Sequence, residues 1–512
     1  MKKYSDLEYL KLPKWKRLIY TFICTIFAIP GGIWNFFKKI GLAIAKFVTD
    51  FAKDIADIGV TFKNGDWKTR TSFVVMGFGN IARGQILRGL LFLLMEVVFV
   101  FYMVTSGAHW MSMLTSLGLQ GPTKVYDEIF DTYITTYHDN SFKILLYGVL
   151  TVFFIVGFIF TWRVNIRQNK IAQQILASGK KLKSGKDDLR SLVDDKFHAT
   201  LLSLPLLGIL IFTVMPMVFM ILVAFTNYDS INDGYMNSLF TWVGLDNFKT
   251  MLFWGAGNDA YSATFGEILT WTLIWAFFAT FTNYFLGMVV AMMINKKGIK
   301  FKKFWRACLV MTIAVPQFIS LMYVSKMLAP NGIVNGFLID MGWIDPQSPL
   351  PFWTDVTWAR ISIIVVNVWI GIPYLMLMAT GILMNIPADL YESAKIDGAG
   401  AWKQYTKITL PYMLFVTGPY LLTQFTGNMN NFNVIYLLTG GGPSMTDAAG
   451  VLGAPGRTDL LVTWLFKMIT TSEPAAYNLA SVIGIMVFVV VALISLVVYN
   501  VMPSIKNEED FQ

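Results

Sequence analysis

The sequence predicts an all-α integral membrane protein with about eight transmembrane helices. Of its 512 residues, 55% are hydrophobic and only 14% are charged, against roughly 25% charged residues in an ordinary soluble domain. The mean hydropathy is +0.55, and a soluble fold of this length could not bury so much apolar surface. The composition therefore excludes a disordered chain and a freely soluble enzyme. Two cysteines, Cys24 and Cys308, both in apolar stretches, make no disulfide framework.

Eight stretches are long and apolar enough to cross a bilayer, which takes roughly 20 residues. They are 86–105, 143–162, 199–226, 267–294, 304–327, 359–384, 412–438 and 477–502. If each stretch crosses once, the loops between them alternate between the two sides of the membrane. The distribution of charge over these loops then tests the assignment.

Lysine and arginine divide unevenly between the two sides. Of 41 such residues, 33 lie in 1–85, 163–198, 295–306, 385–410 and 503–512. Only four, Lys124, Lys249, Arg457 and Lys467, lie in 106–142, 227–266, 328–358 and 439–476. Acidic residues divide almost evenly, 16 against 14. A bias in basic residues alone identifies the first side as cytoplasmic, so both termini are expected there, and the net charge of +9 calls for no nucleic-acid partner.

The first 85 residues are predicted to lie on the cytoplasmic membrane surface. The apolar run 18–37 is broken by Pro30-Gly31-Gly32, and a single crossing would place the basic N-terminus outside. The next stretch, 40–60, carries five charges among apolar residues at helical spacing, which favours an interfacial amphipathic helix. The alternative is a hairpin that crosses twice, although it would immerse those charges. No small-residue cleavage site follows the apolar run, which argues against a secretory signal.

The predicted spans contain no catalytic or metal-ligating constellation. Three histidines, His109, His138 and His198, fall in loops or at span edges without metal-ligand spacing. Glu96 is the only carboxylate well within a span, and it is interpreted as a satisfied interhelical group. The sequence has no G-x-x-x-x-G-K phosphate loop. An ion-coupled secondary carrier, which would bury paired ionisable groups, and a membrane-embedded enzyme are therefore the disfavoured alternatives.

Neutral polar residues and helix breakers instead gather near the middle of four spans. They are Thr280 and Asn283; Pro316 and Gln317; Asn367, Gly371 and Tyr374; and Gln424, Asn428 and Asn431. Amides donate to and accept from hydroxyl groups, and broken helices at this depth are tolerated where they line a cavity. Because transporters place their sites near the midplane, the pattern predicts a pathway for an uncharged polar solute. The alternative is that the amides only join helices and that glycine permits close packing.

The cytoplasmic loop 386–411, IPADLYESAKIDGAGAWKQYTKITLP, predicts a helix, a sharp turn and a second helix. Pro387 suits the start of the first helix. Gly398 and Gly400 allow the turn, and Pro411 ends the second helical piece. A rigid helix-turn-helix between two spans fits the groove of a partner and transmits force to the spans.

This loop resembles the EAA motif of permease subunits in ATP-binding-cassette importers. The matching residues are Glu392, Ser393, Ala394, Gly398, Ile408, Leu410 and Pro411, with Ser393 in place of the usual alanine. The strings VNVWIGIPYLM, NNFNVIYLLTGGGP and TDLLVTW look like the larger, MalF-type permease subunit of maltose/maltodextrin importers. The resemblance covers about 199–502. Within this class, import of another oligosaccharide is the open alternative.

The resemblance implies a type I importer permease fold. A six-helix core, 199–502, would follow an N-terminal region, 1–85, and two extra spans with a basic loop, 86–198; a tail, 503–512, would end the chain. The assembly would contain a second homologous permease, two ATPase subunits that hold ATP and magnesium, and an external solute-binding protein. This chain would itself bind no cofactor or metal and catalyse no reaction. It would dock to an ATPase through Glu392, Ser393, Ala394, Asp397 and Gly398.

The resemblance also implies the residues that line the sugar site. Carried over position by position, these are Ile313, Gln317, Asn367, Ile370, Gly371, Tyr374, Gly427, Asn428 and Asn431. Most belong to the mid-span polar set found from the sequence itself. Ile313 and Gly427 depart from relatives that present aromatic groups to the sugar.

The outside loop 106–142 is short. Gram-negative relatives carry a large folded insertion in this subunit, and this loop cannot hold a substantial domain. The sequence therefore predicts a Gram-positive cell, in which a lipid-anchored binding protein delivers the sugar.

Overall fold

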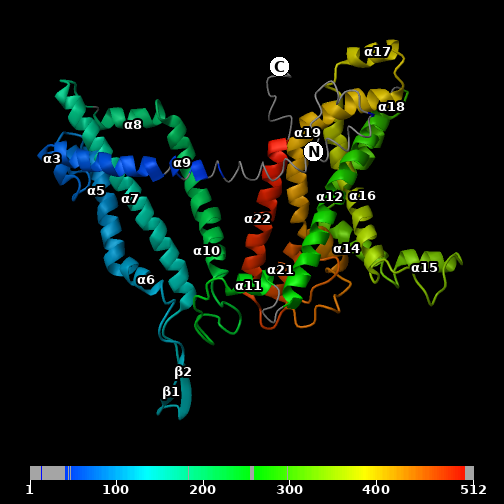
Figure 1. The fold of residues 1–512 in the computed structure, drawn as a ribbon, viewed down its shortest axis with the longest axis horizontal. Helices are drawn as coiled ribbons and strands as arrows, with labels where there is room; N and C mark the ends of the chain where they lie inside the picture. Colours follow the sequence, from blue (N-terminus) through cyan, green and yellow to red (C-terminus); the bar gives the residue numbers. More distant parts are fainter. Residues whose placement is uncertain are drawn as a thin grey trace. The chain divides into compact units, whose positions relative to one another are not determined.

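The computed structural model describes residues 13, 38, 41–43, 45–46, 48–182, 184–253, 259–296 and 298–501 (Figure 1). The chain divides into two compact units, Met1–Trp242 (unit 1) and Val243–Gln512 (unit 2). The first predicted core span, 199–226, therefore lies in unit 1. The predicted apolar run 18–37 and the tail 503–512 lie outside the described residues.

Unit 1 begins, within the described residues, with a helix that includes residues 48–64. Its other helices are α3 (Trp67–Thr71), α4 (Phe78–Ile81), α5 (Ile86–Tyr102), η1 (Met103–Gly107), α6 (Ala108–Met113), α7 (Ser141–Ala177), α8 (Gly185–Val193), α9 (Phe197–Ile209), η2 (Leu210–Val214) and α10 (Met215–Val223). Two strands, β1 (Thr123–Asp127) and β2 (Thr132–Thr136), form an antiparallel hairpin in which Thr123 lies opposite Thr136. The predicted all-α fold is thus interrupted by a hairpin in the outside loop 106–142.

Unit 2 is helical throughout its described elements. They are α11 (Asp246–Leu252), α12 (Asp259–Asn295), α13 (Lys302–Ala314), α14 (Gln317–Met327), α15 (Ile333–Asp340), α16 (Val356–Leu383), α17 (Ala388–Ile396), α18 (Ala401–Gln404), η3 (Tyr405–Thr409), α19 (Leu410–Met429), α20 (Phe432–Thr439), α21 (Leu461–Thr470) and α22 (Tyr477–Val501).

Six continuous helical stretches in the described residues are long and apolar enough to span a membrane. They are Ile86–Met113, Ser141–Ala177, Phe197–Val223, Asp259–Asn295, Val356–Leu383 and Tyr477–Tyr499. All six coincide with predicted spans. The other two predicted spans are broken helices. The span 304–327 is α13 and α14, bent by 89° at Pro316, which has no N–H to continue the helix.

The last predicted span, 412–438, is divided into α19 and α20 at Asn430 and Asn431. Asn431 adopts a non-helical conformation, and its side chain accepts a hydrogen bond from Val434 N–H as the N-cap of α20. Asparagine favours such caps because its side chain replaces the missing backbone partner. The break places two amide side chains between α19 and the shorter α20.

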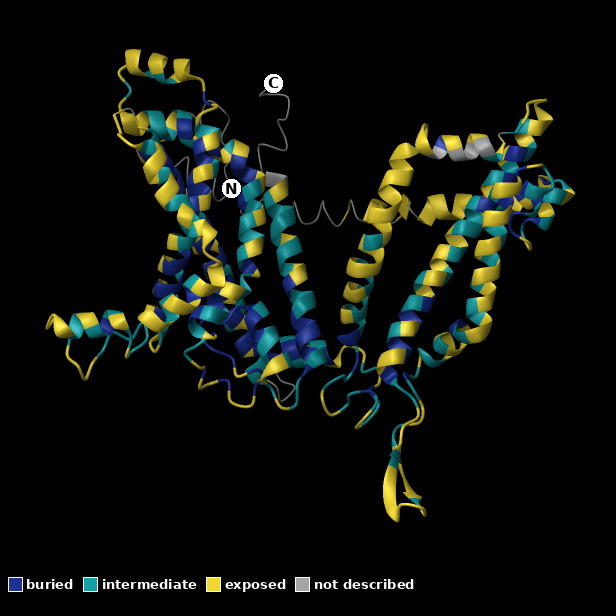
Figure 2. Ribbon diagram, turned by 180° about the vertical axis from the view of Figure 1, so that it is seen from behind, coloured by how far each residue is buried: buried dark blue, intermediate teal, exposed yellow. Residues whose placement is uncertain are grey.

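The buried core of unit 2 forms around α12 and α16. One cluster includes Trp271, Trp275 and Ile363, and Figure 2 shows the buried residues gathered along these helices. The two helices lie close because glycine stands at their contact: a Cβ at Gly287 would lie 2.7 Å from the Cβ of Leu375. In unit 1, by contrast, the stretch Phe197–Val223 is exposed over most of its length.

Candidate functional site

The bend between α13 and α14 opens a pocket against α16. Its volume is about 280 Å³. Side chains that line it include Ile313, Gln317, Ser320, Trp369, Ile370 and Tyr374. Four of these are predicted sugar-site residues, and all six come from a broken helix and the helix beside it. The pocket therefore offers amide, hydroxyl and aromatic groups without a formal charge.

Trp369 and Ser320 line the pocket but were not predicted. The prediction followed one face of α16 at i, i+4 and i+7 from Asn367, and that spacing passes over Trp369. About half of the Trp369 side chain is exposed. A tryptophan directly before Ile370, beside a polar face in mid-span, was the signal that could have found it.

Asn428 and Asn431, at the break between α19 and α20, lie together beside α12. Asn431 Nδ2 donates to Asn428 Oδ1 over 3.3 Å, and Asn428 Nδ2 donates to Thr280 Oγ1 over 3.0 Å. The backbone carbonyl of Asn428 accepts a further hydrogen bond from the Trp275 indole, at 3.0 Å. The neighbouring Gly427 faces open space, where an added Cβ would meet no atom within 4 Å. The network thus links the break between α19 and α20 to α12.

Asn367 and Gly371 lie between α16 and α12 and do not line the pocket. Asn367 is only 5% exposed, and its Nδ2 is buried without a hydrogen-bond partner. Gly371 lies against the amide of Asn283: a Cβ added to Gly371 would lie 2.3 Å from Asn283 Nδ2. The nine predicted residues thus form a pocket group, an asparagine pair with Gly427, and a group packed against α12.

Residues 283–507 match the family described as "Binding-protein-dependent transport system inner membrane component". The chain is 33% identical over 441 residues to the maltodextrin transport system permease protein MdxF of Bacillus subtilis (strain 168). That similarity covers 85% of this chain and 95% of MdxF. This chain belongs to the permeases of binding-protein-dependent transport systems.

A second relative agrees with this family. The permease is 32% identical over 439 residues to the galactooligosaccharides transport system permease protein GanP of the same Bacillus strain, covering 85% of this chain and 97% of GanP. It is also similar to a chain in the crystal structure of a bacterial alginate ABC transporter in complex with an alginate pentasaccharide-bound periplasmic protein. That similarity has 21% identity and a TM-score of 0.47, and covers 62% of the permease and 97% of that chain.

The predicted helix-turn-helix of the permease is present at 386–411, but its second helix does not end at Pro411: α18, η3 and α19 follow one another without a break. α17 ends at Ile396, and Gly398 then adopts φ +72°, a left-handed conformation that favours glycine. The Ala399 N–H donates a hydrogen bond to the Ala394 carbonyl at 2.8 Å, which stabilises the turn. The Tyr391 hydroxyl lies 2.8 Å from Thr409 Oγ1 and ties the loop to the start of α19.

The same loop presents an exposed surface. Glu392, Ser393, Asp397 and Gly398 are exposed, and Ala394 is half-buried. Two large apolar side chains stand beside them, Ile396 at 86% and Trp402 at 76% exposed. Apolar side chains exposed next to charged ones are typical of a protein-binding surface.

A loop between α20 and α21, 440–460, closes over the N-terminal ends of α12 and α16. Arg457 donates to both oxygens of Glu267, at 2.5 and 2.6 Å, and Arg360 donates twice to the Arg457 carbonyl. Asp459, fully buried, accepts from Lys467 Nζ at 2.7 Å. Burial raises the pKa of Asp459 above its usual value, although Lys467 and Thr463 act in the opposite direction. The loop is thus fixed at the predicted outer side.

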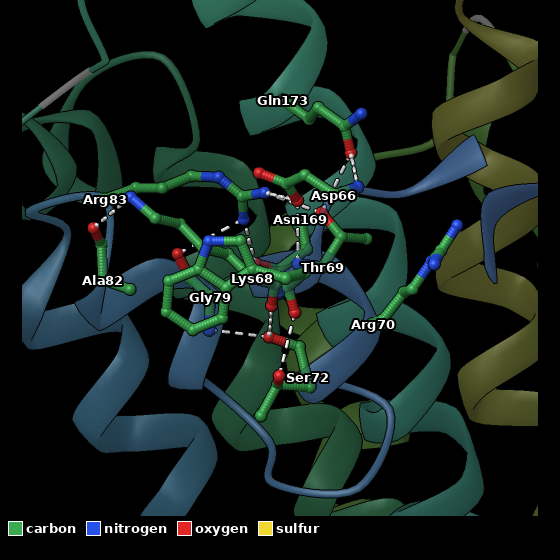
Figure 3. Close-up of polar contacts among 12 residues, drawn as sticks. Asp66, Lys68, Thr69, Arg70, Ser72, Gly79, Ala82, Arg83, Asn169 and Gln173 are labelled. Carbon is green, nitrogen blue, oxygen red and sulfur yellow. Dashed lines mark hydrogen bonds and ion pairs between the residues drawn. The ribbon is translucent and has the colours of Figure 1, made fainter. Parts of the chain in front are cut away.

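A second polar group, here called the Arg83 cluster, lies within unit 1 (Figure 3). The Arg83 side chain is 1% exposed. Its guanidinium donates to Asp66 Oδ1 at 2.5 Å, Thr69 Oγ1 at 2.6 Å and Asn169 Oδ1 at 2.8 Å. Gln173 Oε1 completes the cluster by accepting from Asp66 N–H and the Thr69 hydroxyl. Burial raises the pKa of Asp66, but Thr69 and Arg83 outweigh it and hold the pKa below its usual value.

Two further contacts bear on the predictions for unit 1. Glu96 Oε2 accepts from Met76 N–H at 2.7 Å, so this carboxylate is a satisfied group, as predicted. The helix that includes residues 48–64 lies along the end of α7, where Asp57 pairs with Lys170 at 2.5 Å and Asp54 pairs with Arg163. Its apolar residues Phe51 and Ile55 are exposed.

Proposed function

We propose that the permease forms half of the sugar pathway of an ATP-driven importer for maltose and maltodextrins. The observation that carries the proposal is the pocket at the α13–α14 bend, with Gln317, Trp369 and Tyr374 on its wall. Small-molecule sites occupy roughly 300–1,000 Å³, so a pocket of about 280 Å³ holds part of an oligosaccharide. Amides bind sugar hydroxyls, and aromatic rings stack on the apolar face of a pyranose.

The asparagine residues extend this site. Asn431 bonds to Asn428, which bonds to Thr280, and Asn367 is buried on α16. In the proposed cycle these amides exchange their present partners, or gain one, when sugar enters. The pocket and these amides alternately face the two sides of the membrane, and the sugar then passes inward.

The loop 386–411 couples this movement to ATP. An ATPase subunit binds the exposed surface around Glu392, Ser393 and Asp397, and Gly398 keeps the turn in the shape that the ATPase requires. ATP and magnesium are held by the two ATPase subunits, and this chain binds no cofactor. A second permease completes the pathway, and a lipid-anchored solute-binding protein delivers the sugar to the outer side.

The orientation in the membrane follows the distribution of lysine and arginine, with both termini in the cytoplasm. The outside loop 106–142 folds as the short helix α6 and a two-stranded hairpin. It lacks the large folded insertion of Gram-negative relatives, so the cell is Gram-positive. The helix that includes residues 48–64 lies on the inner membrane surface, with Phe51 and Ile55 toward lipid.

Galactooligosaccharides are the second candidate substrate. GanP, at 32% identity, is nearly as similar to this permease as MdxF. Both sugars carry hydroxyls and apolar ring faces, so the pocket chemistry alone suits either.

The test is ATP-driven uptake of labelled maltotriose into proteoliposomes that contain the permease with its partner subunits and binding protein. Unlabelled maltodextrins and galactooligosaccharides are added as competitors. The proposal predicts uptake that maltodextrins suppress and galactooligosaccharides do not. Uptake of a labelled galactooligosaccharide without uptake of maltotriose favours the second candidate, and uptake that needs an ion gradient but no ATP contradicts the importer.

A further inference from the structure

Two buried amide atoms between α12 and α16 have no hydrogen-bond partner. They are Asn283 Oδ1, an acceptor, and Asn367 Nδ2, a donor. Both residues are more than nine-tenths buried, at 8% and 5% exposed. Unpaired buried polar atoms cost stability, so a pair of them in one helix contact requires an explanation.

The packing places Asn283 beside the predicted sugar residues. Its amide lies against Gly371, where a Cβ would come within 2.3 Å of Nδ2. Gly371 is one helical turn after Asn367 on α16. Thr280, one turn before Asn283 on α12, accepts the hydrogen bond from Asn428. Asn283 is thus next to both the α16 residues and the asparagine pair, although the resemblance did not include it in the sugar site.

The two atoms are complementary. A hydroxyl group donates one hydrogen bond and accepts others through the same oxygen. A single hydroxyl that lies between the two atoms would satisfy Asn283 Oδ1 as donor and Asn367 Nδ2 as acceptor. A cation would leave Nδ2 unpaired, and an anion would repel Oδ1. The pair selects a neutral hydroxyl, which belongs either to a sugar or to a water molecule.

We propose that Asn283 is a further specificity-determining residue, which together with Asn367 binds one hydroxyl of the transported sugar. The inference rests on the proposed sugar function. In the conformation described here both atoms are closed off between the helices, and the movement that admits sugar separates α12 from α16 enough to expose them. The missing Cβ of Gly371 leaves the space into which the Asn283 amide fits when the site is closed.

A purely structural role for Asn283 would require hydrogen bonds that stabilise the helix pair. Its Oδ1, which would accept such a bond, has no partner within the part of the chain that the structure describes. Asn295, on the same helix, differs: its Nδ2 donates to the Ala291 carbonyl at 2.8 Å and to Thr380 Oγ1 at 3.1 Å. Asn295 is therefore the matched control.

The experiment compares maltotriose with its monodeoxy analogues as competitors of ATP-driven uptake by the complete transporter in proteoliposomes. In the wild type, at least one analogue competes more weakly than maltotriose because it lacks the bound hydroxyl. Asn283→Leu reduces the preference over that analogue about ten-fold, since one hydrogen bond of a buried pair is lost. Asn295→Leu leaves the preference unchanged but lowers the melting temperature of the purified complex, which Asn283→Leu does not.

Two variants test which atom each residue contributes. Asn283→Asp keeps an acceptor oxygen in either protonation state and retains the preference within about two-fold. Asn367→Leu loses the Nδ2 donor and reduces the preference about ten-fold. Equal effects of Asn283→Asp and Asn367→Leu would overturn the assignment. An unchanged preference for every analogue in Asn283→Leu would also overturn it, because the pair would then bind a water molecule and not the sugar. If the wild type does not transport maltotriose, the proposed substrate is wrong but the role of Asn283 is not. The same variants are then compared with the deoxy analogues of the sugar that is transported.

Discussion

The Arg83 cluster of unit 1 and the amide groups of unit 2 are both buried and polar, but they differ in how completely they are paired. Arg83 donates to Asp66, Thr69 and Asn169, and none of these side chains is buried without a partner. In unit 2, Asn283 Oδ1 and Asn367 Nδ2 lack partners. A paired cluster fixes a fold, whereas unpaired groups of complementary type are kept for a ligand. Each prediction below separates loss of fold from loss of transport.

The largest effect on transport is expected from Gly398→Pro in the helix-turn-helix. Proline fixes φ near −65°, whereas Gly398 has φ +72°. The turn cannot form, so ATP-driven uptake should be abolished while the permease still inserts into the membrane. Uptake in proteoliposomes and membrane content are measured side by side.

Gly400→Pro is the matched control for this change. Gly400 has φ −67°, which proline adopts without strain. Its transport should stay close to the wild type. Normal uptake by Gly398→Pro would argue against any role of the turn in coupling.

The largest effect on stability is expected from Arg83→Met. Arg83 is almost fully buried whereas Asp66 is 39% exposed, so the main loss is that the buried acceptors of Thr69 and Asn169 are left unpaired, which costs about 1–3 kcal/mol. The melting temperature of the purified permease should fall strongly, while the sugar preference of the molecules that remain folded is unchanged. Arg70→Met, which removes an exposed guanidinium bound to the Phe62 and Lys63 carbonyls, should cost only about 1 kcal/mol. Equal losses in the two variants would mean that the cluster does not hold unit 1 together.

Asn431→Ala should act on transport more than on stability. It removes the amide that bonds to Asn428 and the cap of α20, a cap worth about 1 kcal/mol. Sugar uptake at low sugar concentration should fall about ten-fold, with ATPase binding intact. The exposed neighbour Asn430, changed to alanine, serves as the control. A parallel fall of uptake and ATPase binding in Asn431→Ala would point to a structural role.

The smallest effect is expected from Gln317→Leu in the pocket. Gln317 begins α14 and lines the pocket, and it is exposed, so its loss leaves no buried group unpaired. Uptake at low sugar concentration should fall by about two- to five-fold, the value of one solvent-exposed hydrogen bond. An unchanged dependence of uptake on sugar concentration would place the sugar elsewhere in unit 2.

The spans were predictable because apolar runs are local in sequence. Six of the eight coincide with continuous helices, and the helix-turn-helix followed from Pro387 and Gly398. The predicted stop at Pro411 was wrong, because proline is tolerated in the first turn of α19 and the helix runs on through it. The 89° bend was less accessible, since Pro316 predicts a break but not its angle. The hairpin 123–136 was missed, although its strands are rich in threonine, tyrosine, valine and isoleucine, which favour strands.

The site was predicted in part. The i, i+3 spacing of Asn428 and Asn431 placed them together, and they do bond. Spacing gives a face of one helix but not its rotation against the next, so it could not show that Asn367 is buried while Tyr374 lines the pocket. The Arg83 cluster could not be predicted at all, because Asp66 and Asn169 meet only through the packing of α7 on α3 and α4.

The most direct test of the account is whether an ATPase subunit copurifies with the tagged permease expressed together with its neighbouring genes, with Glu392→Lys as the matched variant. The account predicts that the wild type retains the ATPase and that Glu392→Lys loses it without loss of the permease from the membrane, because the charge on the exposed docking surface is reversed. A permease that purifies without any ATPase and still transports sugar into proteoliposomes would contradict the account.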